Sequence, residues 1–189
     1  MSTTRRPFWG KYRGRVDDNA DPYQLGRLKL KIPSVLGSNV SGWALPAFPF
    51  AGAGLAPSSG VGLFLIPPKD AWVWVEFEHG NPERPIWTGC FFPDDPTAIA
   101  PTVQSLLPLQ GVDPDKQVLK AGKWLITIDG DTLKFEHVAG VLPRVRAELD
   151  GSSVKLSNEQ VSGAVAPTCA TVELTGGKAA INGTALEVT

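Results

Sequence analysis

Residues 14–37 read GRVDDNADPYQLGRLKLKIPSVLG, and residues 66–90 read IPPKDAWVWVEFEHGNPERPIWTGC. In the first stretch, residues 25–32 alternate: Leu28, Leu30 and Ile32 share one face and charged residues the other, which predicts a strand from Leu25 to Ile32 with one buried face. The second stretch alternates in the same way before a polar turn leads into another apolar run, as in a hairpin. Together the two stretches predict an all-β barrel with tight polar corners.

The composition is that of a globular protein built from short strands. The chain has 189 residues, of which 42% are hydrophobic and 20% charged, and its net charge is −1. Its 20 glycines and 17 prolines follow no collagen-like period, so we expect many strands joined by tight turns. The balanced charge argues against binding nucleic acid through its phosphates, because such proteins usually carry a basic excess.

Cysteine usage and the N-terminal sequence bear on the cellular compartment. Two cysteines, Cys90 and Cys169, are too few for a disulfide framework, and we interpret both as reduced, buried thiols. The N-terminal residues show no apolar segment of a signal peptide, and no apolar run approaches the ~20 residues that span a bilayer. These patterns favour assembly in a bacterial cytoplasm.

Three similar units of strand, glycine turn and strand follow in the C-terminal part of the chain. Their central glycines are Gly130, Gly151 and Gly176, spaced 21 and 25 residues apart. One such unit cannot bury its apolar row alone, and three units make a ribbon with little core of its own. We therefore expect a trimeric β-prism or intertwined β-helix in which three copies share a core. The alternative is an ordinary continuation of one monomeric β-sandwich.

The residues expected to face the shared trimer axis are the alternating apolar members of these units. They are Ile126, Ile128, Leu133, Phe135, Leu149, Val154, Leu156, Leu174 and Ile181. In the N-terminal part, Trp72 and Trp74 lie on the opposite strand face from the apolar core residues. Two large indoles there need cover, which either a segment of the same chain or a subunit interface would supply.

No grouping for catalysis or metal binding is visible in the sequence. The two histidines, His79 and His137, are not spaced as metal ligands, and no nucleophile motif, phosphate loop or dinucleotide fingerprint occurs. Glu76 and Glu78 share a strand face with two tryptophans, as in a glycosidase cleft, but charges at the rim of a surface are the simpler interpretation. We expect no catalytic residue, no metal, no cofactor and no enzymatic activity.

A series of short motifs occurs in a fixed order between residues 8 and 95. They include Arg15-Val16, Asp21-Pro22, Leu25-Gly26-Arg27, Ile32-Pro33-Ser34, Gly42-Trp43-Ala44, Ile66-Pro67-Pro68 and Pro85-Ile86-Trp87-Thr88-Gly89. This order resembles the OB-type barrel of the phage baseplate assembly protein V family, which is related to the valine-glycine repeat (VgrG) spikes of type VI secretion. The resemblance implies an N-terminal five-stranded OB-fold domain at residues 1–95, an extended linker at 96–117, and a trimeric β-helix or β-prism spike at 118–189.

The resemblance also implies a function. The chain would form the homotrimeric central spike in the baseplate of a contractile phage tail or phage-tail-like injection system, bind a hub protein, and pierce the target envelope. We expect a blunt end near Leu186, Glu187, Val188 and Thr189 that docks a PAAR-type tip protein, because no tapering loop or histidine pair is present there. The alternative is an OB-fold binding module for single-stranded nucleic acid or oligosaccharide; the glutamates beside the tryptophans disfavour nucleic acid.

Overall fold

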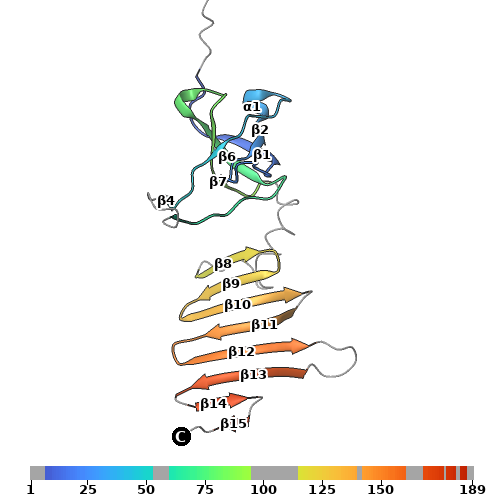
Figure 1. Cartoon of the computed structure of the whole chain (residues 1–189), viewed down its shortest axis with the longest axis vertical. Helices are drawn as coiled ribbons and strands as arrows, with labels where there is room; N and C mark the ends of the chain where they lie inside the picture. The colour runs from blue at the N-terminus through green and yellow to red at the C-terminus, as the bar shows by residue number, and fades with distance from the viewer. Residues whose placement is uncertain are drawn as a thin grey trace, which may run out of the picture. The chain divides into compact units, whose positions relative to one another are not determined.

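The structure is a computed structural model that describes residues 7–52, 60–94, 115–139, 142–160, 168–176, 178–181 and 184–186. Apart from turns and loops, the described chain forms β-strands, one turn of helix, α1 (Pro33–Leu36), and a 3-10 turn, η1 (Glu78–Gly80). The predicted all-β class is confirmed. The chain divides into two compact units, Met1–Pro96 and Thr97–Thr189 (Figure 1).

The first unit contains a five-stranded barrel. Its strands are β1 (Tyr12–Asp18), β2 (Lys29–Lys31), β3 (Leu45–Pro46), β6 (Trp72–Phe77) and β7 (Pro85–Cys90). They follow the order β2-β1-β6-β7-β3, with β3 and β7 parallel and the other pairs antiparallel. Bridges from Leu28 to Ala44 and from Lys31 to Val40 bring the two edges together. Five strands closed in this way form an OB-type barrel.

The barrel has its own core, and the alternation read from the sequence supplies it. Nine hydrophobic residues are buried in one cluster: Val16, Leu28, Leu30, Ile32, Ala44, Val73, Val75, Phe77 and Trp87. Burying a large apolar side chain contributes about 1.5–3 kcal/mol. The close packing explains Gly14 in β1, where an added Cβ would lie 2.7 Å from the Val75 side chain. The predicted strand from Leu25 is shorter than expected, because β2 begins at Lys29 and Leu25 is exposed.

The second unit is a single eight-stranded antiparallel sheet. Its strands are β8 (Lys116–Ala121), β9 (Trp124–Asp129), β10 (Thr132–Ala139), β11 (Leu142–Leu149), β12 (Ser153–Gln160), β13 (Thr168–Thr175), β14 (Lys178–Ile181) and β15 (Thr184–Leu186). Each strand pairs with the next one along the chain, so the sheet is a meander (Figure 1). In the part of this unit that the structure describes, no second layer of strands packs on the sheet.

The three repeated units of the sequence are hairpins of this sheet, β9–β10, β11–β12 and β13–β14. Gly130 and Gly176 turn two of them with φ of 57° and 53°, a left-handed conformation that favours glycine. Asp150 holds the turn of the remaining hairpin, β11–β12, by accepting hydrogen bonds from the backbone N–H and hydroxyl groups of Ser152 and Ser153. These bonds, led by the one from the Ser152 N–H, lower the pKa of Asp150 to about 2.

Three details differ from the sequence interpretation or lie beyond it. Cys90 is an exposed free thiol and not a buried one, because it ends strand β7. Strand β8 begins at Lys116, inside the segment predicted as a linker, most of which (residues 96–114) lies outside the described residues. A third, two-stranded sheet pairs β4 (Ala51–Gly52) with β5 (Val61–Gly62). None of the described helices is long and apolar enough to cross a membrane.

Candidate functional site

The residues predicted to face a trimer axis all lie on one face of the eight-stranded sheet. Directly opposed residues on neighbouring strands point to the same face, and the face alternates along each strand. One row crosses from β8 to β14 as Leu119, Ile126, Phe135, Ala147, Leu156, Val172 and Ile181. A second row runs beside it as Ile128, Leu133, Leu149, Val154, Leu174 and Ala179. We call this surface the apolar face.

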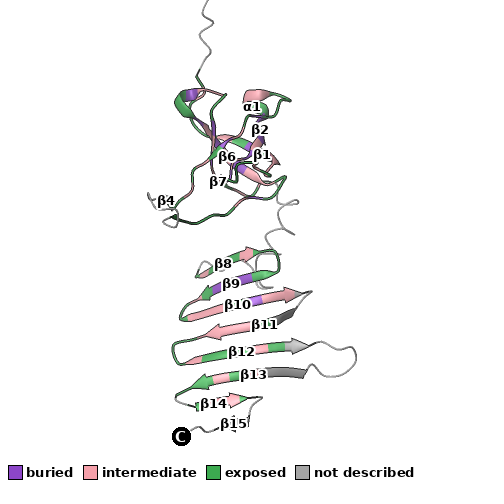
Figure 2. Ribbon diagram, in the orientation of Figure 1, coloured by how far each residue is buried: buried purple, intermediate pink, exposed green. Residues whose placement is uncertain are grey.

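The apolar face is open to solvent in the single chain. Its exposed fractions include 46% for Ile128, 40% for Phe135, 49% for Leu156, 49% for Leu174 and 47% for Ile181. Figure 2 shows buried residues on only β9 and β10 of the sheet, and among the described residues Leu125 is its one buried hydrophobic side chain. A contiguous exposed apolar surface of this kind marks an interaction site.

The opposite face of the sheet is charged. Ion pairs link neighbouring strands across it: Lys116 to Asp129 at 3.0 Å, Lys134 to Glu148 at 3.4 Å, and Arg146 to Glu136 at 2.7 Å. The register also sets Lys155 opposite both Glu148 and Glu173. Opposite charges directly across a strand pair stabilise the sheet modestly and disfavour a shifted register. The sheet is therefore amphipathic, with one charged face and one apolar face.

The residues expected at the tip are only partly placed. Leu186 ends β15 at a register position opposite Ala179, which is on the apolar face. Glu187, Val188 and Thr189 lie outside the described residues.

In the first unit, Trp72 and Trp74 are half-buried on the outside of the barrel and are covered by the same chain. The Trp74 indole stacks on the Phe91 ring, with centroids 4.4 Å apart and planes inclined by 28°, and the Trp72 ring lies 5.9 Å from the same phenyl group. The register sets Arg13 opposite Trp74 and Arg15 opposite Trp72. The guanidinium carbon of Arg13 lies 5.9 Å from the centroid of the Trp74 ring, and that of Arg15 lies 6.0 Å from the centroid of the Trp72 ring.

The cations on this outer surface are each paired with a carboxylate. Lys11 pairs with Glu76 at 2.7 Å, and Arg13 and Arg15 pair with Asp94 and Asp70. The sequence interpretation placed Glu78 beside the tryptophans, but Glu78 begins η1 and pairs with Arg84. The sequence interpretation did not place Arg13, Arg15 and Phe91 beside the tryptophans. The spacing of Arg13 and Arg15 by two residues nevertheless indicates that they share a strand face.

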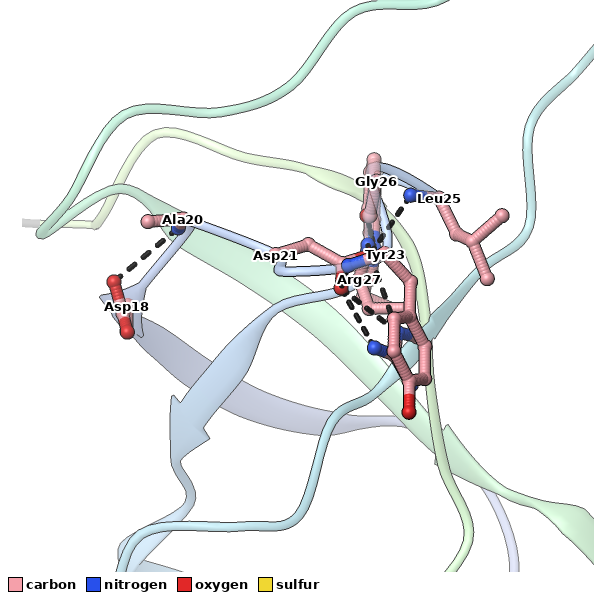
Figure 3. A network of polar contacts seen from close by, with 8 residues as sticks. Asp18, Ala20, Asp21, Tyr23, Leu25, Gly26 and Arg27 are labelled. Atoms are coloured by element: carbon pink, nitrogen blue, oxygen red, sulfur yellow. Dashed lines mark hydrogen bonds and ion pairs between the residues drawn. The ribbon is translucent and has the colours of Figure 1, made fainter.

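The turn before β2 is held by a buried carboxylate (Figure 3). The Asp21 carboxylate accepts hydrogen bonds from the backbone N–H groups of Tyr23, Leu25 and Arg27. The Nη2 of the Arg27 guanidinium lies 2.7 Å from the Asp21 Oδ1. The hydrogen bond from Arg27 is the largest cause that holds the pKa of Asp21 well below its ordinary range, and the backbone N–H groups add to it against the opposing effect of burial. Two motifs of the family resemblance, Asp21-Pro22 and Leu25-Gly26-Arg27, therefore have a structural role.

The described residues hold no group of three metal-ligating side chains. His79 is exposed in the β6–β7 turn. His137 lies inside β10 and packs edge-on against Trp124 with ring centroids 4.9 Å apart.

These features define a class of protein: an OB barrel followed by a single-layer, amphipathic meander sheet. Residues 12–92 match the family model of the Type VI secretion system/phage-baseplate injector OB domain, and the resemblance stated from the sequence is confirmed for this part of the chain. A comparison with curated proteins gives no match. The matched family indicates a phage or type VI secretion baseplate role, as a component of a virion or injection particle, and it is a structural family and not a known family of enzymes.

Proposed function

We propose that this chain is the homotrimeric central spike of a contractile phage tail or tail-like injection particle, which attaches to the baseplate hub and pierces the target envelope. One observation carries the proposal. An injector OB domain is followed in the same chain by an eight-stranded sheet whose apolar face is uncovered. A single-layer sheet with an exposed apolar face is not stable in water unless another surface buries that face.

Other copies of the chain supply that surface. Three sheets arranged as a prism bury all three apolar faces toward one axis and leave the three charged faces in water. A face-to-face pair of sheets would also bury the apolar rows, so the number of copies is the quantity to measure. Light scattering on the full chain distinguishes the cases, because the proposal expects three times the chain mass of 20.2 kDa. A folded monomer or a dimer at micromolar concentration would contradict it.

The partners at the two ends follow from the same proposal. The OB barrel binds the hub, and the edge of the sheet at β15 docks a PAAR-type tip protein through Leu186 and residues 187–189. An unpaired strand edge is a template for association, and β15 is the last strand of the meander. Imaging of assembled particles tests this part. Additional density capping the spike next to β15 is expected, and a spike closed to a point by these three chains alone would rule out the tip protein.

The arrangement of arginines over Trp72 and Trp74 is the one feature that favours an oligonucleotide- or oligosaccharide-binding module. Its cations are already neutralised by carboxylates, so the surface offers phosphates no net positive charge. Tryptophan fluorescence during titration with single-stranded DNA or a peptidoglycan oligosaccharide decides the matter at low salt. We expect no saturable change; saturable quenching that is lost in Trp74→Ala would support the binding module instead.

The proposal includes the absence of enzymatic activity. Glu76 faces Lys11 and Glu78 faces Arg84, so the two carboxylates do not converge on one cleft as a glycosidase pair must. Purified protein should leave peptidoglycan intact. Cleavage that disappears in Glu76→Gln or Glu78→Gln would overturn this part.

A further inference from the structure

A second group of aromatic residues lies on the outside of the barrel, where the turn before β2 meets β3. Leu28 and Ala44 pair in an antiparallel bridge and are both buried in the core. The residues next to them, Lys29 and Trp43, therefore face outward. The Tyr23 side chain extends from the turn and is 72% exposed. We give the name outer cluster to Tyr23, Arg27, Lys29 and Trp43.

Arg27 holds the two aromatic rings of the outer cluster in place. Its guanidinium carbon lies 4.7 Å from the centroid of the Tyr23 ring and 5.5 Å from that of the Trp43 ring. Figure 3 shows the Tyr23 ring beside Arg27. The Arg27 side chain is 15% exposed, and the Asp21 side chain that neutralises it is 3% exposed. The guanidinium is therefore a fixed spacer between the rings, and rings held in this way lose little conformational freedom when a partner binds them.

Lys29 gives the outer cluster a cation that no carboxylate of the described chain neutralises. Its Nζ lies 5.1 Å from the centroid of the Trp43 ring. The other described lysines and arginines of the barrel all form ion pairs of 3.4 Å or less. Asp18, which the register sets opposite Lys29, pairs with Lys69 instead. The Lys29 ammonium group is therefore available to a carboxylate from outside the barrel.

We propose that the outer cluster binds an acidic segment of another protein of the baseplate. A carboxylate of this segment pairs with Lys29, and an adjacent apolar side chain packs on the rings of Tyr23 and Trp43. The matched family indicates contacts with other baseplate components, and the proposal names the surface and the chemistry of one of them. The cluster lies within one barrel, so the inference does not depend on the proposed trimer.

The residue types of the outer cluster favour a protein partner. Tyrosine, tryptophan and arginine are the residues most enriched where binding energy is concentrated in protein interfaces. A nucleic acid needs several cations along its phosphates, and the cluster offers one cation that is not neutralised. An acidic peptide segment matches both the single charge and the exposed rings.

Selection from a displayed library of random short peptides tests the proposal on the full chain. The wild-type protein is the bait, and a variant that combines Tyr23→Ser with Lys29→Gln removes peptides that bind elsewhere. Both residues lie outside the barrel core, so the variant should keep the wild-type melting temperature. We expect the remaining peptides to carry Asp or Glu next to an aromatic or aliphatic residue. The proposal is wrong if no peptide distinguishes the two proteins, or if the peptides that do so lack Asp and Glu.

Calorimetry with a selected peptide then isolates the contribution of the charge. Lys29→Gln should weaken binding at least about tenfold and remove most of its dependence on salt, because the lost contact is an ion pair. Lys29→Glu should bind a version of the peptide in which lysine replaces the acidic residue. Lys31→Gln is the matched control, because Lys31 lies two residues further along β2 and already pairs with Asp17. Equal affinity in Lys29→Gln and Lys31→Gln would overturn the proposal, and so would binding of single-stranded DNA that Lys29→Gln abolishes.

Discussion

The barrel and the sheet use the same sequence pattern with opposite results. Both alternate apolar and polar residues along their strands, yet the barrel buries nine hydrophobic residues in one cluster while the described part of the sheet buries one hydrophobic residue, Leu125. The difference is closure. The bridges from Leu28 to Ala44 and from Lys31 to Val40 fold the barrel sheet onto itself, whereas the meander extends strand by strand and leaves its apolar face open.

The alternation of apolar and polar residues assigns each side chain to one face of the sheet. It does not determine what covers that face. A closed sheet covers its own apolar face, and an open single layer needs a partner. The barrel should therefore be stable as a unit, and the stability of the sheet should depend on assembly.

The largest expected effect comes from a charge on the apolar face. Ile128→Asp or Leu133→Asp should abolish the trimer and unfold the sheet while the barrel stays folded, because an unpaired buried charge costs several kcal/mol and occurs once in each copy. Ser157→Asp is the matched control, since Ser157 lies opposite Arg146 on the charged face and should keep the assembly. Light scattering gives the mass and limited proteolysis reports on each unit. Full trimer stability in Ile128→Asp would show that this residue faces water.

Much of the fold could be predicted because the deciding signals are local. The alternation of Leu28, Leu30 and Ile32 predicted a buried row, and the glycine turns at Gly130 and Gly176 predicted hairpins; the structure confirms them. Their spacing also put the apolar residues of the three units on one face. The shared core between copies remains a prediction, since it depends on chains outside this structure.

What the sequence did not show depends on contacts between distant segments. The position of Arg13 over Trp74 requires the β1–β6 register, which joins residues far apart in the chain. The short β2 results from Asp21, whose carboxylate holds the Leu25 N–H and keeps this residue in the turn. Cys90 was expected to be a buried, reduced thiol because two cysteines are too few for a disulfide framework, but it is the exposed last residue of strand β7.

A cavity in the barrel core should have the next largest effect and should spare the assembly. Leu30→Ala removes a side chain that is 0% exposed, and we expect it to lower the free energy of unfolding of the barrel by about 2–5 kcal/mol. Leu45→Ala, at a leucine that is 52% exposed, is the control and should change it little. Thermal unfolding is followed by tryptophan fluorescence together with the oligomer mass. Loss of the trimer in Leu30→Ala would show that the two units do not fold independently.

A smaller effect is expected at Gly26, where the turn before β2 packs against Phe48 and Ile66. Gly26→Ala combines a left-handed backbone conformation with contacts below 3.0 Å to Ile66 and Phe48, so it should destabilise the barrel by about 1–3 kcal/mol. Gly42→Ala is the control, because nothing lies within 4 Å of the added Cβ. Denaturant unfolding of both variants measures the difference. Equal midpoints would mean that the side chains of Phe48 and Ile66 move aside without cost and are not tightly packed against the turn.

The smallest expected effect is on the pH dependence of the stability of the barrel. The pKa of Asp21 is held down in the folded barrel, so its contribution to stability is complete above the ordinary aspartate pKa of about 3.9 and is lost as the pH falls below that value. Asp21→Asn should therefore lower the barrel melting temperature at pH 7 and flatten its dependence on pH between 5 and 2. Asp70→Asn removes an exposed partner of Arg15 and should leave both the melting temperature and the slope nearly unchanged. An unchanged slope in Asp21→Asn would mean that the turn keeps its form without the ion pair, and the stability of the barrel would then rest on its apolar core alone.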